Sequence, residues 1–244
     1  MMKGQGLKNG SFFRQYRQKG MVIIMKNIKR SFCIIGLGRF GQTLAKNLVA
    51  AGHQVLVIDI DENIINVMSD VVTNAVVGDP TNEAVLHAAG VSDYDCAVVA
   101  TAENINDSVL TTILLKEIGV KQVISRAGSE RHGRVLEKVG ADMVVFPEKD
   151  MGEKLVNILE RNNVLEYIEF SDSHSIVEIK VPDKWVGKSL VELDIRRRYG
   201  VTVLAVGDAD TGEMNISPDP TKKFGRDDTV AILGESKAID KITK

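Results

Sequence analysis

The chain contains 244 residues, of which 44% are hydrophobic and 26% are charged, and its formal net charge is −2. This balance is typical of a globular protein with one large domain or two smaller ones. No apolar run approaches the roughly 20 residues that a membrane-spanning helix needs, and no secretory signal peptide is visible. The composition therefore disfavours both an integral membrane protein and a secreted one.

The chain begins with a strongly basic segment, and its first acidic residue is Asp59. We expect residues 1–30 to form a disordered leader. A basic arm of this kind could also contact anionic lipid or nucleic acid. Met25 is an alternative start, because a compact domain that begins at Ser31 needs nothing upstream of it.

From Ser31 onward, short apolar runs alternate with helical patterns. Six nearly continuous runs of Val, Ile and Ala are typical of parallel strands that are covered on both faces. Gly52, Gly119 and Gly140 follow the intervening helical segments and are expected to end them. This alternation predicts an α/β, doubly wound parallel sheet of the Rossmann type over residues 31–148. Its strands are expected at Ser31–Leu37, Gln54–Asp59, Thr73–Val77, Cys96–Ala100, Gln122–Arg126 and Met143–Phe146.

The pattern changes after the sixth strand. Lys149–Asn162 predicts an amphipathic connector helix, assigned to residues 149–163. Residues 164–244 are expected to form a smaller α+β domain with strands at Ser175–Val181, Thr202–Val206 and Thr229–Leu233. The two cysteines, Cys33 and Cys96, fall in apolar strand-like runs and are predicted to be buried thiols.

A glycine-rich motif follows the first predicted strand and opens the first helix. It reads Gly36-Leu37-Gly38-Arg39-Phe40-Gly41, and Asp59 ends the second strand about 20 residues later, as in the dinucleotide-binding fingerprint. We expect Gly36 to permit the turn, Gly38 to let phosphates approach the backbone and Gly41 to allow close helix packing. The helix N-terminus would bind the phosphates and Asp59 the ribose hydroxyls. The alternative is that the glycines serve packing alone.

Arg39 adds a cation inside this loop, which favours ATP or ADP over the shorter phosphate chain of NAD; the alternative is a solvated arginine. Further candidates lie where the other strands end, since ligands bind at that edge of such sheets. Glu148 is reasonable near phosphates only with a cation between them; otherwise it is an ordinary helix-start acid. Thr81 is a candidate helix cap, and His132 is more easily explained as a solvated helix-start residue. The complete set of cofactor-binding candidates is Gly36, Gly38, Arg39, Phe40, Gly41, Asp59, Asp79, Pro80, Thr101, Asn104, Arg126, His132 and Glu148.

In their order along the chain, these motifs resemble the RCK (TrkA-N/TrkA-C) family, specifically the Ktr-type regulatory subunits of potassium uptake. The resemblance covers Ser31 to the C-terminus. It rests on GLGRFG (Gly36–Gly41), VLVID ending at Asp59, GDPT from Gly78, TTILLKEIG (Thr111–Gly119), VLEKVGAD (Val135–Asp142) and FPEKDMG (Phe146–Gly152), and on VGKSLVELDIRRRYGVTVLAV (Val186–Val206) in the second domain.

The resemblance implies a cytoplasmic regulatory subunit that is not an enzyme. It implies homodimers that assemble into an octameric ring beneath a membrane-spanning potassium channel or transporter subunit, with ATP favouring the conducting state and ADP the closed one. Arg39 would approach the terminal phosphates and Asp59 the ribose, while Asp79, Thr101 and Arg126 would complete the pocket. Glu148 would help to hold a divalent or monovalent cation at the dimer interface. Cyclic di-AMP would inhibit uptake through the C-terminal domain, with Arg196 and Pro218 as its candidate contacts.

Three departures from the family pattern leave the ligand preference open: the long basic leader, Pro80 after Gly-Asp, and Arg126 where many relatives carry Lys. NAD or NADH is the alternative ligand. Two other functions compete with the regulatory one. An NAD-dependent oxidoreductase would need a substrate domain with a proton donor, yet the second domain has about 80 residues and a single histidine, His174. A DNA-binding repressor would need a recognition helix, and none is visible, so no nucleic acid partner is expected.

Overall fold

The structure is a computed structural model, and it describes residues 29–102, 104–160, 163–171, 173–209 and 211–243. All but the last two residues of the predicted leader lie outside the described residues. The chain divides into two compact units, with the division between Asp150 and Met151. Each unit is described by itself below.

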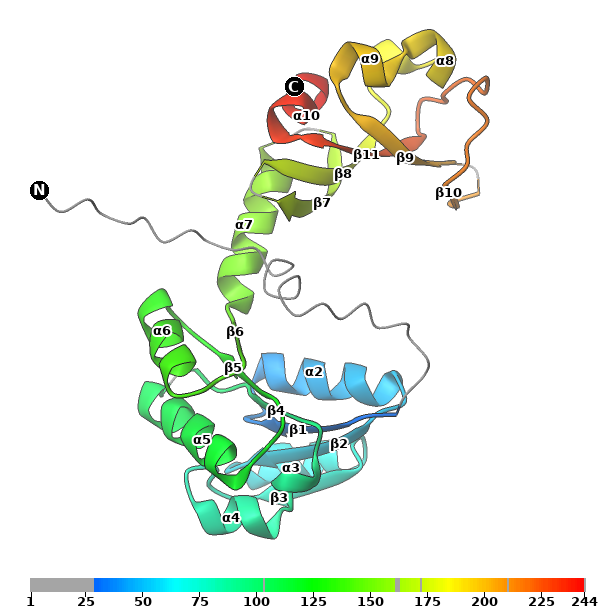
Figure 1. Ribbon diagram of the computed structural model, residues 1–244. Coiled ribbons are helices and arrows are strands. Elements are labelled where there is room, and N and C mark those ends of the chain that lie inside the picture. The colour runs from blue at the N-terminus through cyan, green and yellow to red at the C-terminus, as the bar shows by residue number, and fades with distance from the viewer. Residues whose placement is uncertain (1–28, 103, 161–162, 172, 210, 244) are drawn as a thin grey trace, which may run out of the picture. The chain divides into compact units, whose positions relative to one another are not determined.

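The first unit is built on a six-stranded sheet in which every neighbouring pair is parallel. Its order, β3-β2-β1-β4-β5-β6, is the doubly wound arrangement expected from the sequence, and the fold class is confirmed (Figure 1). The strands are β1 (Ser31–Ile35), β2 (Gln54–Asp59), β3 (Asn74–Val77), β4 (Cys96–Val99), β5 (Val123–Arg126) and β6 (Met143–Val145). The helices are α2 (Arg39–Ala50), α3 (Glu62–Ser69), α4 (Glu83–Ala88), α5 (Ile105–Ile118) and α6 (Glu130–Lys138), with a 3-10 turn, η1, at Val91–Asp93. Helix α7 (Pro147–Leu159) begins in this unit, and the division between the units falls within it.

Two layers of helices cover this sheet because successive strand residues point to opposite faces. One face packs Ile34 and Val57 against Ile65 and Met68 of α3 and Ala45 of α2. The other face packs a second cluster against α4, η1 and α5, with Cys33, Ile35, Leu56, Leu86 and Leu115 among its members. The sheet is therefore covered on both faces, which explains why its strands are apolar throughout.

The two cysteines lie in adjacent strands but on opposite faces of the sheet. Cys33 belongs to the cluster under α4 and α5, and Cys96 to the cluster under α2 and α3. Both are buried and free, as predicted. Burial raises the pKa of Cys33 far above its usual range and that of Cys96 to about 11, which disfavours the reactive thiolate form of both side chains at neutral pH.

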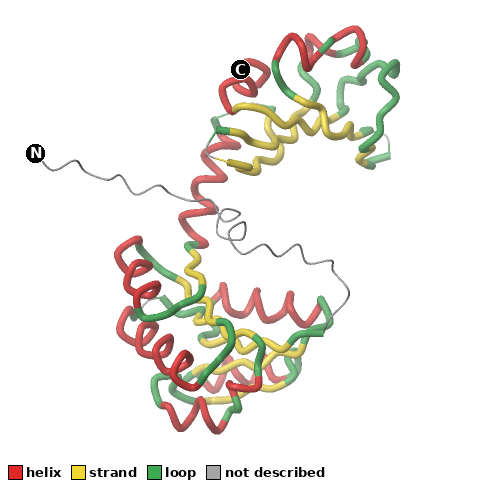
Figure 2. Tube along the Cα trace, in the orientation of Figure 1, coloured by secondary structure: helices red, strands yellow, loops and turns green. Residues whose placement is uncertain are grey.

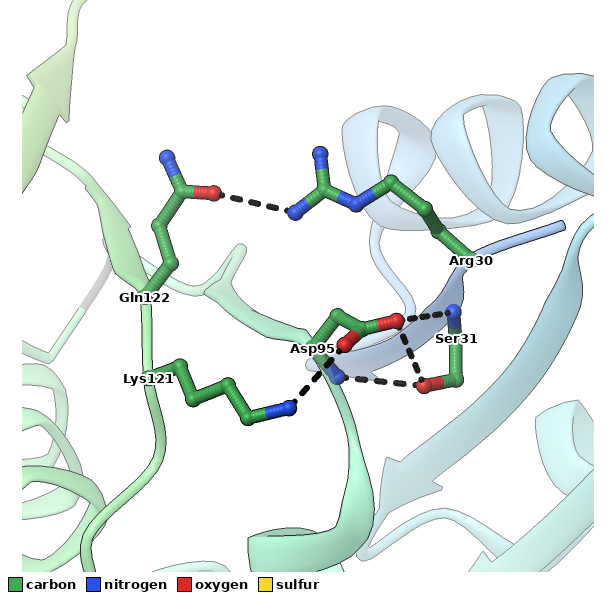
Figure 3. A network of polar contacts seen from close by, with 5 residues as sticks. All are labelled: Arg30, Ser31, Asp95, Lys121 and Gln122. Carbon is green, nitrogen blue, oxygen red and sulfur yellow. Dashed lines mark hydrogen bonds and ion pairs between the residues drawn. The ribbon is translucent and has the colours of Figure 1, made fainter. Parts of the chain in front are cut away.

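A polar network fastens the amino-terminal ends of three strands, and Figure 3 shows it from close by. Asp95, just before β4, accepts hydrogen bonds from the backbone N–H and the hydroxyl of Ser31 in β1, at 3.0 and 3.2 Å. Lys121, before β5, forms an ion pair with the same carboxylate at 3.3 Å, and Arg30 donates to Gln122. The Ser31 backbone N–H is the largest influence that lowers the pKa of Asp95. This edge of the sheet is thus occupied by its own side chains.

The second unit contains a five-stranded antiparallel sheet in the order β10-β9-β11-β8-β7, which confirms the predicted α+β architecture (Figure 2). Its strands are β7 (Val164–Ser171), β8 (His174–Lys180), β9 (Thr202–Gly207), β10 (Met214–Asn215) and β11 (Thr229–Glu235). Its helices are the 3-10 turn η2 (Asp183–Trp185), α8 (Leu190–Leu193), α9 (Ile195–Tyr199) and α10 (Ser236–Thr243). Trp185 is fully buried in its core, between Tyr199 and Phe224.

The structure differs from the predicted elements at several points. The sequence predictions did not include β7, β10 or any individual helix of the second unit, and the expected connector helix begins at Pro147 rather than Lys149. Proline is favoured in the first turn of a helix because its missing N–H has no partner there in any case. Gly119 does end α5 with φ of 92°, and Gly52 and Gly140 also have positive φ after α2 and α6. No helix in the described part of the chain combines the length and apolar character that would let it cross a bilayer.

Candidate functional site

A cavity of about 370 Å³ opens at the carboxyl-terminal edge of the parallel sheet. Loops that follow β1, β2, β3 and β4 and the last residue of β5 contribute to it, and this is the edge at which ligands bind in doubly wound sheets. Seven of the thirteen predicted residues line it: Gly36, Gly38, Asp59, Asp79, Pro80, Thr101 and Arg126. The remaining lining residues are Leu37, Ile58, Ile60, Thr81, Ala100, Ala102 and Asp107.

The glycine-rich loop has the geometry that its three glycines were expected to supply. Gly36 has φ of +89°, and a Cβ there would lie 3.0 Å from the backbone N of Thr101. A Cβ on Gly41 would lie 2.0 Å from the carbonyl oxygen of Gly36, so α2 can approach the loop only without a side chain at that position. A Cβ on Gly38 would meet no atom within 4 Å beyond its chain neighbours, and Gly38 lines the cavity. The turn at Gly36 and the close helix packing at Gly41 are as expected, and the approach of phosphates to Gly38 stays a prediction.

Helix α2 begins without the side-chain cap that its neighbours have. Asp61, Asn82, Asn104 and Ser129 cap α3, α4, α5 and α6, each accepting a hydrogen bond from a backbone N–H of the first turn. The corresponding residue of α2 is Gly38, which has no side chain to do this. The N–H groups of this first turn therefore have no side-chain cap, Gly38 before them lines the cavity, and such a helix terminus attracts anions.

Asp59 holds the shape of the loop from the end of β2. Its carboxylate accepts from the Leu37 N–H at 2.5 Å and from the Asp61 N–H at 2.9 Å. Each carboxylate oxygen can accept more than one hydrogen bond, so these contacts leave capacity for a ribose hydroxyl. The prediction that Asp59 binds ribose stays a prediction, and the structure adds a loop-positioning role.

Arg126 carries the positive charge at the far side of the cavity. Its Nη1 donates to the carbonyl oxygen of Ala100 at 3.3 Å, its Nη2 pairs with Glu148 at 2.5 Å, and its guanidinium lies 5.9 Å from the centre of the Phe40 ring. The Nε atom is buried and has no hydrogen-bond partner. A buried donor without a partner costs free energy, on the order of 1–3 kcal/mol.

Glu148 lies beside the cavity rather than in its lining. Burial raises the pKa of this carboxyl, but hydrogen bonds from its own backbone N–H and from Arg126, with the charges of Arg126 and Arg39, outweigh burial and lower the pKa overall. The described residues contain no group of three or more His, Cys, Asp or Glu side chains that could hold a metal ion. Within one chain, the partner of Glu148 is thus a guanidinium, and the expected cation contact stays a prediction.

The loop after β3 is held by its own side chains. The carboxylate of Asp79 accepts from the Thr81 hydroxyl at 2.7 Å and from the Thr81 backbone N–H at 2.8 Å, and these contacts lower the pKa of Asp79. The cap of α4 is Asn82, so the expectation that Thr81 caps this helix is wrong. Asn82 stands immediately before the first helical residue, which is the position where a cap is needed.

Three other predicted residues lie outside the cavity lining. Arg39 is exposed on the first turn of α2, and Asn104 uses its side chain to cap α5. His132 is buried, with 2% of its surface exposed, so the prediction of a solvated histidine is wrong. Its Nε2 lies 2.7 Å from the Ser108 hydroxyl, and its Nδ1 accepts weakly from the Gly128 N–H at 3.4 Å. Binding roles for these three residues stay predictions.

The sequence reading missed Asp107, a carboxylate in the first turn of α5 that lines the cavity. The sequence contained a signal for Asp107, because a helix that follows a strand begins at the same edge of the sheet as the end of that strand. Residues of its first turn are therefore candidates for the cavity lining. It also missed the apolar part of the wall, to which Ile60 and Ala102 contribute. These residues fit the apolar base and sugar of a nucleotide.

In the second unit, a cavity of about 230 Å³ includes Pro218 in its lining. Arg196, the other predicted cyclic di-AMP contact, is exposed on α9 and does not line this cavity. The structure does not bring the two residues together in one cavity, and their proposed role stays a prediction.

Comparison with known proteins identifies the family. The TrkA-N domain model matches residues 32–147, and the TrkA-C domain model matches residues 175–244. The chain is 39% identical over 217 residues to Ktr system potassium uptake protein C of Bacillus subtilis (strain 168), covering 89% of this chain and 97% of that protein. It is 40% identical over 210 residues to Ktr system potassium uptake protein A of the same organism, covering 86% and 94%. This chain belongs to the RCK (TrkA-N/TrkA-C) family, among the Ktr-type potassium uptake proteins.

Solved structures agree at the level of the fold. The RCK domain of GsuK has a TM-score of 0.62 and 18% identity, with 90% of this chain and 48% of that chain covered. The GsuK channel bound to NAD also has a TM-score of 0.62 and 18% identity, covering 95% and 43%. This chain thus spans less than half the length of those proteins. The Ktr-type relatives are potassium uptake proteins rather than enzymes, so the expectation of a non-enzymatic protein is confirmed.

Proposed function

We propose that this protein is a nucleotide-sensing regulatory subunit of a potassium uptake system, and that the cavity of the first unit binds the nucleotide. The observation that carries the proposal is the pairing of an uncapped α2 N-terminus, which begins beside Gly38 of the cavity lining, with the guanidinium of Arg126, which lines the same cavity. Both features attract the phosphates of a nucleotide. The relatives named as Ktr potassium uptake proteins support the physiological setting.

ATP and ADP are the proposed ligands, with ATP favouring the conducting state and ADP the closed one. Arg39 stands on the loop at the start of α2, where the phosphates would lie, and it supplies an additional charge for a longer phosphate chain. NAD or NADH is the second candidate, favoured by the carboxylate of Asp59 at the end of β2 and by the NAD named for the GsuK channel.

A ligand can drive gating only by binding two states of an assembly with different affinity. We propose that the chain forms homodimers that assemble into an octameric ring on a membrane-spanning potassium channel or transporter subunit, at the cytoplasmic face of the membrane. Glu148 would contact a divalent or monovalent cation at the dimer interface. Cyclic di-AMP would inhibit uptake through the C-terminal domain, with Arg196 and Pro218 as contacts.

Rubidium flux into proteoliposomes tests the proposal, with this chain reconstituted together with the membrane-spanning subunit of its own uptake system. We expect ATP to raise the flux and ADP to lower it, with neither effect in vesicles that lack this chain. Equal flux with ATP, ADP and no nucleotide would contradict the proposal. The alternative of an NAD-dependent oxidoreductase would instead appear as sustained NADH turnover with a substrate.

A further inference from the structure

Asp107 differs from the other two carboxylates of the cavity lining. Asp59 and Asp79 each accept hydrogen bonds from backbone N–H groups of the loops that form the cavity. Asp107 is the third residue of α5, and its backbone N–H donates to the Asn104 cap at 3.4 Å. Its carboxylate forms no hydrogen bond or ion pair within the described part of the chain. An exposed acceptor that lines a cavity and has no partner in the fold is available to a ligand.

The face of α5 that carries Asp107 is directed toward the loop after β3. Thr111 lies one turn further along this helix, on the same side as Asp107, because residues four apart on a helix are neighbours. The Thr111 hydroxyl donates to the carbonyl oxygen of Pro80 at 3.4 Å, and Pro80 lines the cavity. Asp107 thus belongs to the part of the cavity wall that includes Pro80.

A nucleotide in the proposed orientation would bring its base to this part of the wall. Its phosphates would lie at Gly38, where α2 follows β1, and its ribose at Asp59, which ends β2. The strands run in the order β1, β2, β3 toward one side of the sheet, so the base would continue from the ribose toward the loop after β3. Ile60, which lines the cavity and is 69% exposed, offers this base an apolar surface.

The chemistry of Asp107 also suits a base better than a phosphate. A carboxylate repels phosphate groups, and in its ionised form it can only accept hydrogen bonds. Adenine presents an amino group at C6, which is a hydrogen-bond donor. ATP, ADP and NAD all carry adenine, so this match holds for each of the candidate ligands.

We propose that Asp107 is a specificity-determining residue of the nucleotide site, and that its carboxylate accepts a hydrogen bond from the 6-amino group of adenine. The inference rests on the proposed function, since it requires a nucleotide in the cavity. It concerns the base alone, whereas the phosphates are recognised by the start of α2 and by Arg126.

Calorimetric titration of the full chain with ADP and with purine riboside 5′-diphosphate tests the contact. The second ligand is ADP with hydrogen in place of the 6-amino group. Because the two ligands carry the same ribose and phosphates, the ratio of their affinities separates the base contact from any effect of charge on the phosphates. The wild type should bind ADP about five- to tenfold more tightly, as expected for one charge-assisted hydrogen bond that water can reach.

Substitution of Asp107 should remove this preference. In Asp107→Ala the affinity ratio of the two ligands should fall below about twofold, because ADP loses its partner and the analogue has none to lose. Asp107→Asn keeps the size of the side chain and a neutral acceptor, so its ratio should lie between those of Asp107→Ala and the wild type. Glu117→Ala is the matched control, since Glu117 is an exposed acid on the same helix outside the cavity lining. It should keep the ratio of the wild type.

The outcomes separate this inference from the proposed function. Equal affinity of the wild type for the two ligands overturns the base contact and leaves nucleotide binding standing. A ratio that Asp107→Ala retains also overturns the role of Asp107, and Asp79, the carboxylate next to Pro80, would then be the acceptor. A wild type that binds neither ligand overturns the proposed function and this inference together.

Discussion

At the scale of single residues, the glycine-rich loop shows two different uses of the same amino acid. Gly41 is required by the fold itself, because a Cβ would lie 2.0 Å from the Gly36 carbonyl oxygen. Gly38 meets nothing within 4 Å and has an extended backbone conformation open to any residue, with φ of −62°. The sequence motif does not distinguish these uses, whereas the contacts do.

Alanine at these two positions should therefore separate stability from binding. Gly41→Ala should lower the free energy of unfolding by more than about 2 kcal/mol, because a backbone atom cannot move aside. Gly38→Ala should cost about 1 kcal/mol or less, the usual range for an N-cap change. It should nevertheless weaken ADP binding, since the methyl group fills the approach to the α2 amides.

Urea unfolding of both variants, followed by ADP titration of Gly38→Ala, checks this prediction. Equal destabilisation by the two substitutions would contradict the assigned packing role of Gly41. Unchanged ADP affinity in Gly38→Ala would contradict the proposed position of the phosphates.

At the scale of elements, a buried polar contact joins α5 to α6 behind the cavity. His132 of α6 lies 2.7 Å from the Ser108 hydroxyl of α5, and both side chains are buried. The Gly128 N–H donates a hydrogen bond to Nδ1 of His132, and this nitrogen can accept the bond only while it carries no proton. Burial lowers the pKa of His132, so this ring takes up a proton at a lower pH in the folded protein than in the unfolded chain.

Acidification should consequently weaken the fold through this contact. The unfolded chain takes up a proton near pH 6.5 and the folded chain only at a lower pH, so stability falls as the pH drops below about 6.5. The slope for one such group is at most about 1.4 kcal/mol per pH unit. His132→Gln keeps a hydrogen-bond donor and an acceptor at this position but does not titrate. Between pH 7.5 and 5.5, its free energy of unfolding should therefore fall by about 1 kcal/mol less than that of the wild type.

Chemical denaturation at several pH values measures this difference. The other three histidines are present in both proteins, so their titration cancels in the comparison. Parallel pH profiles for the wild type and His132→Gln would show that His132 does not contribute.

The elements that the sequence predicted are those whose pattern is regular. The six parallel strands are buried on both faces, and their continuous apolar runs are unmistakable. Strand β7 was missed because its register shifts between Val164 and Glu166 and between Glu169 and Ser171, and such irregularities break the alternation of faces. Leu165, Ile168 and Phe170 remain exposed on it, which further obscures the pattern.

The candidate site was predictable in part for the same reason. Strand ends and glycines locate the cavity, because topology brings those loops to one edge of the sheet. His132 was misplaced because a helix-start residue was assumed to face solvent. Its spacing of four from the buried Leu136 places it on the inward face, and this signal was available in the sequence. The ion pair between Arg126 and Glu148 was not predictable, since it depends on side-chain placement.

At the scale of the whole molecule, two compact units with separate hydrophobic cores share one chain. The cavity with the uncapped helix belongs to the first unit, and Trp185, the chain's single tryptophan, is buried in the second. Tryptophan fluorescence therefore reports unfolding of the second unit, whereas circular dichroism reports both.

ADP should accordingly separate the two signals during thermal unfolding. At 100 times its dissociation constant, ADP should raise the transition of the first unit by roughly 10 °C, as expected for a ligand that binds only the folded state. The Trp185 transition should move much less. An equal shift of both signals would show that the two units unfold as one, and a shift of Trp185 alone would place ADP in the second unit.

The measurement that bears most directly on the central claim is the affinity of the wild type and of Arg39→Ala for ATP and ADP by calorimetry. A nucleotide whose phosphates lie at the start of α2 should bind to the wild type. Loss of Arg39 should lower the affinity for ATP about tenfold, because a charge-assisted contact to the terminal phosphate is removed. It should lower the affinity for ADP by less than about threefold. Equal weakening of the two ligands would contradict discrimination by phosphate number. Failure of the wild type to bind either one would contradict the account as a whole.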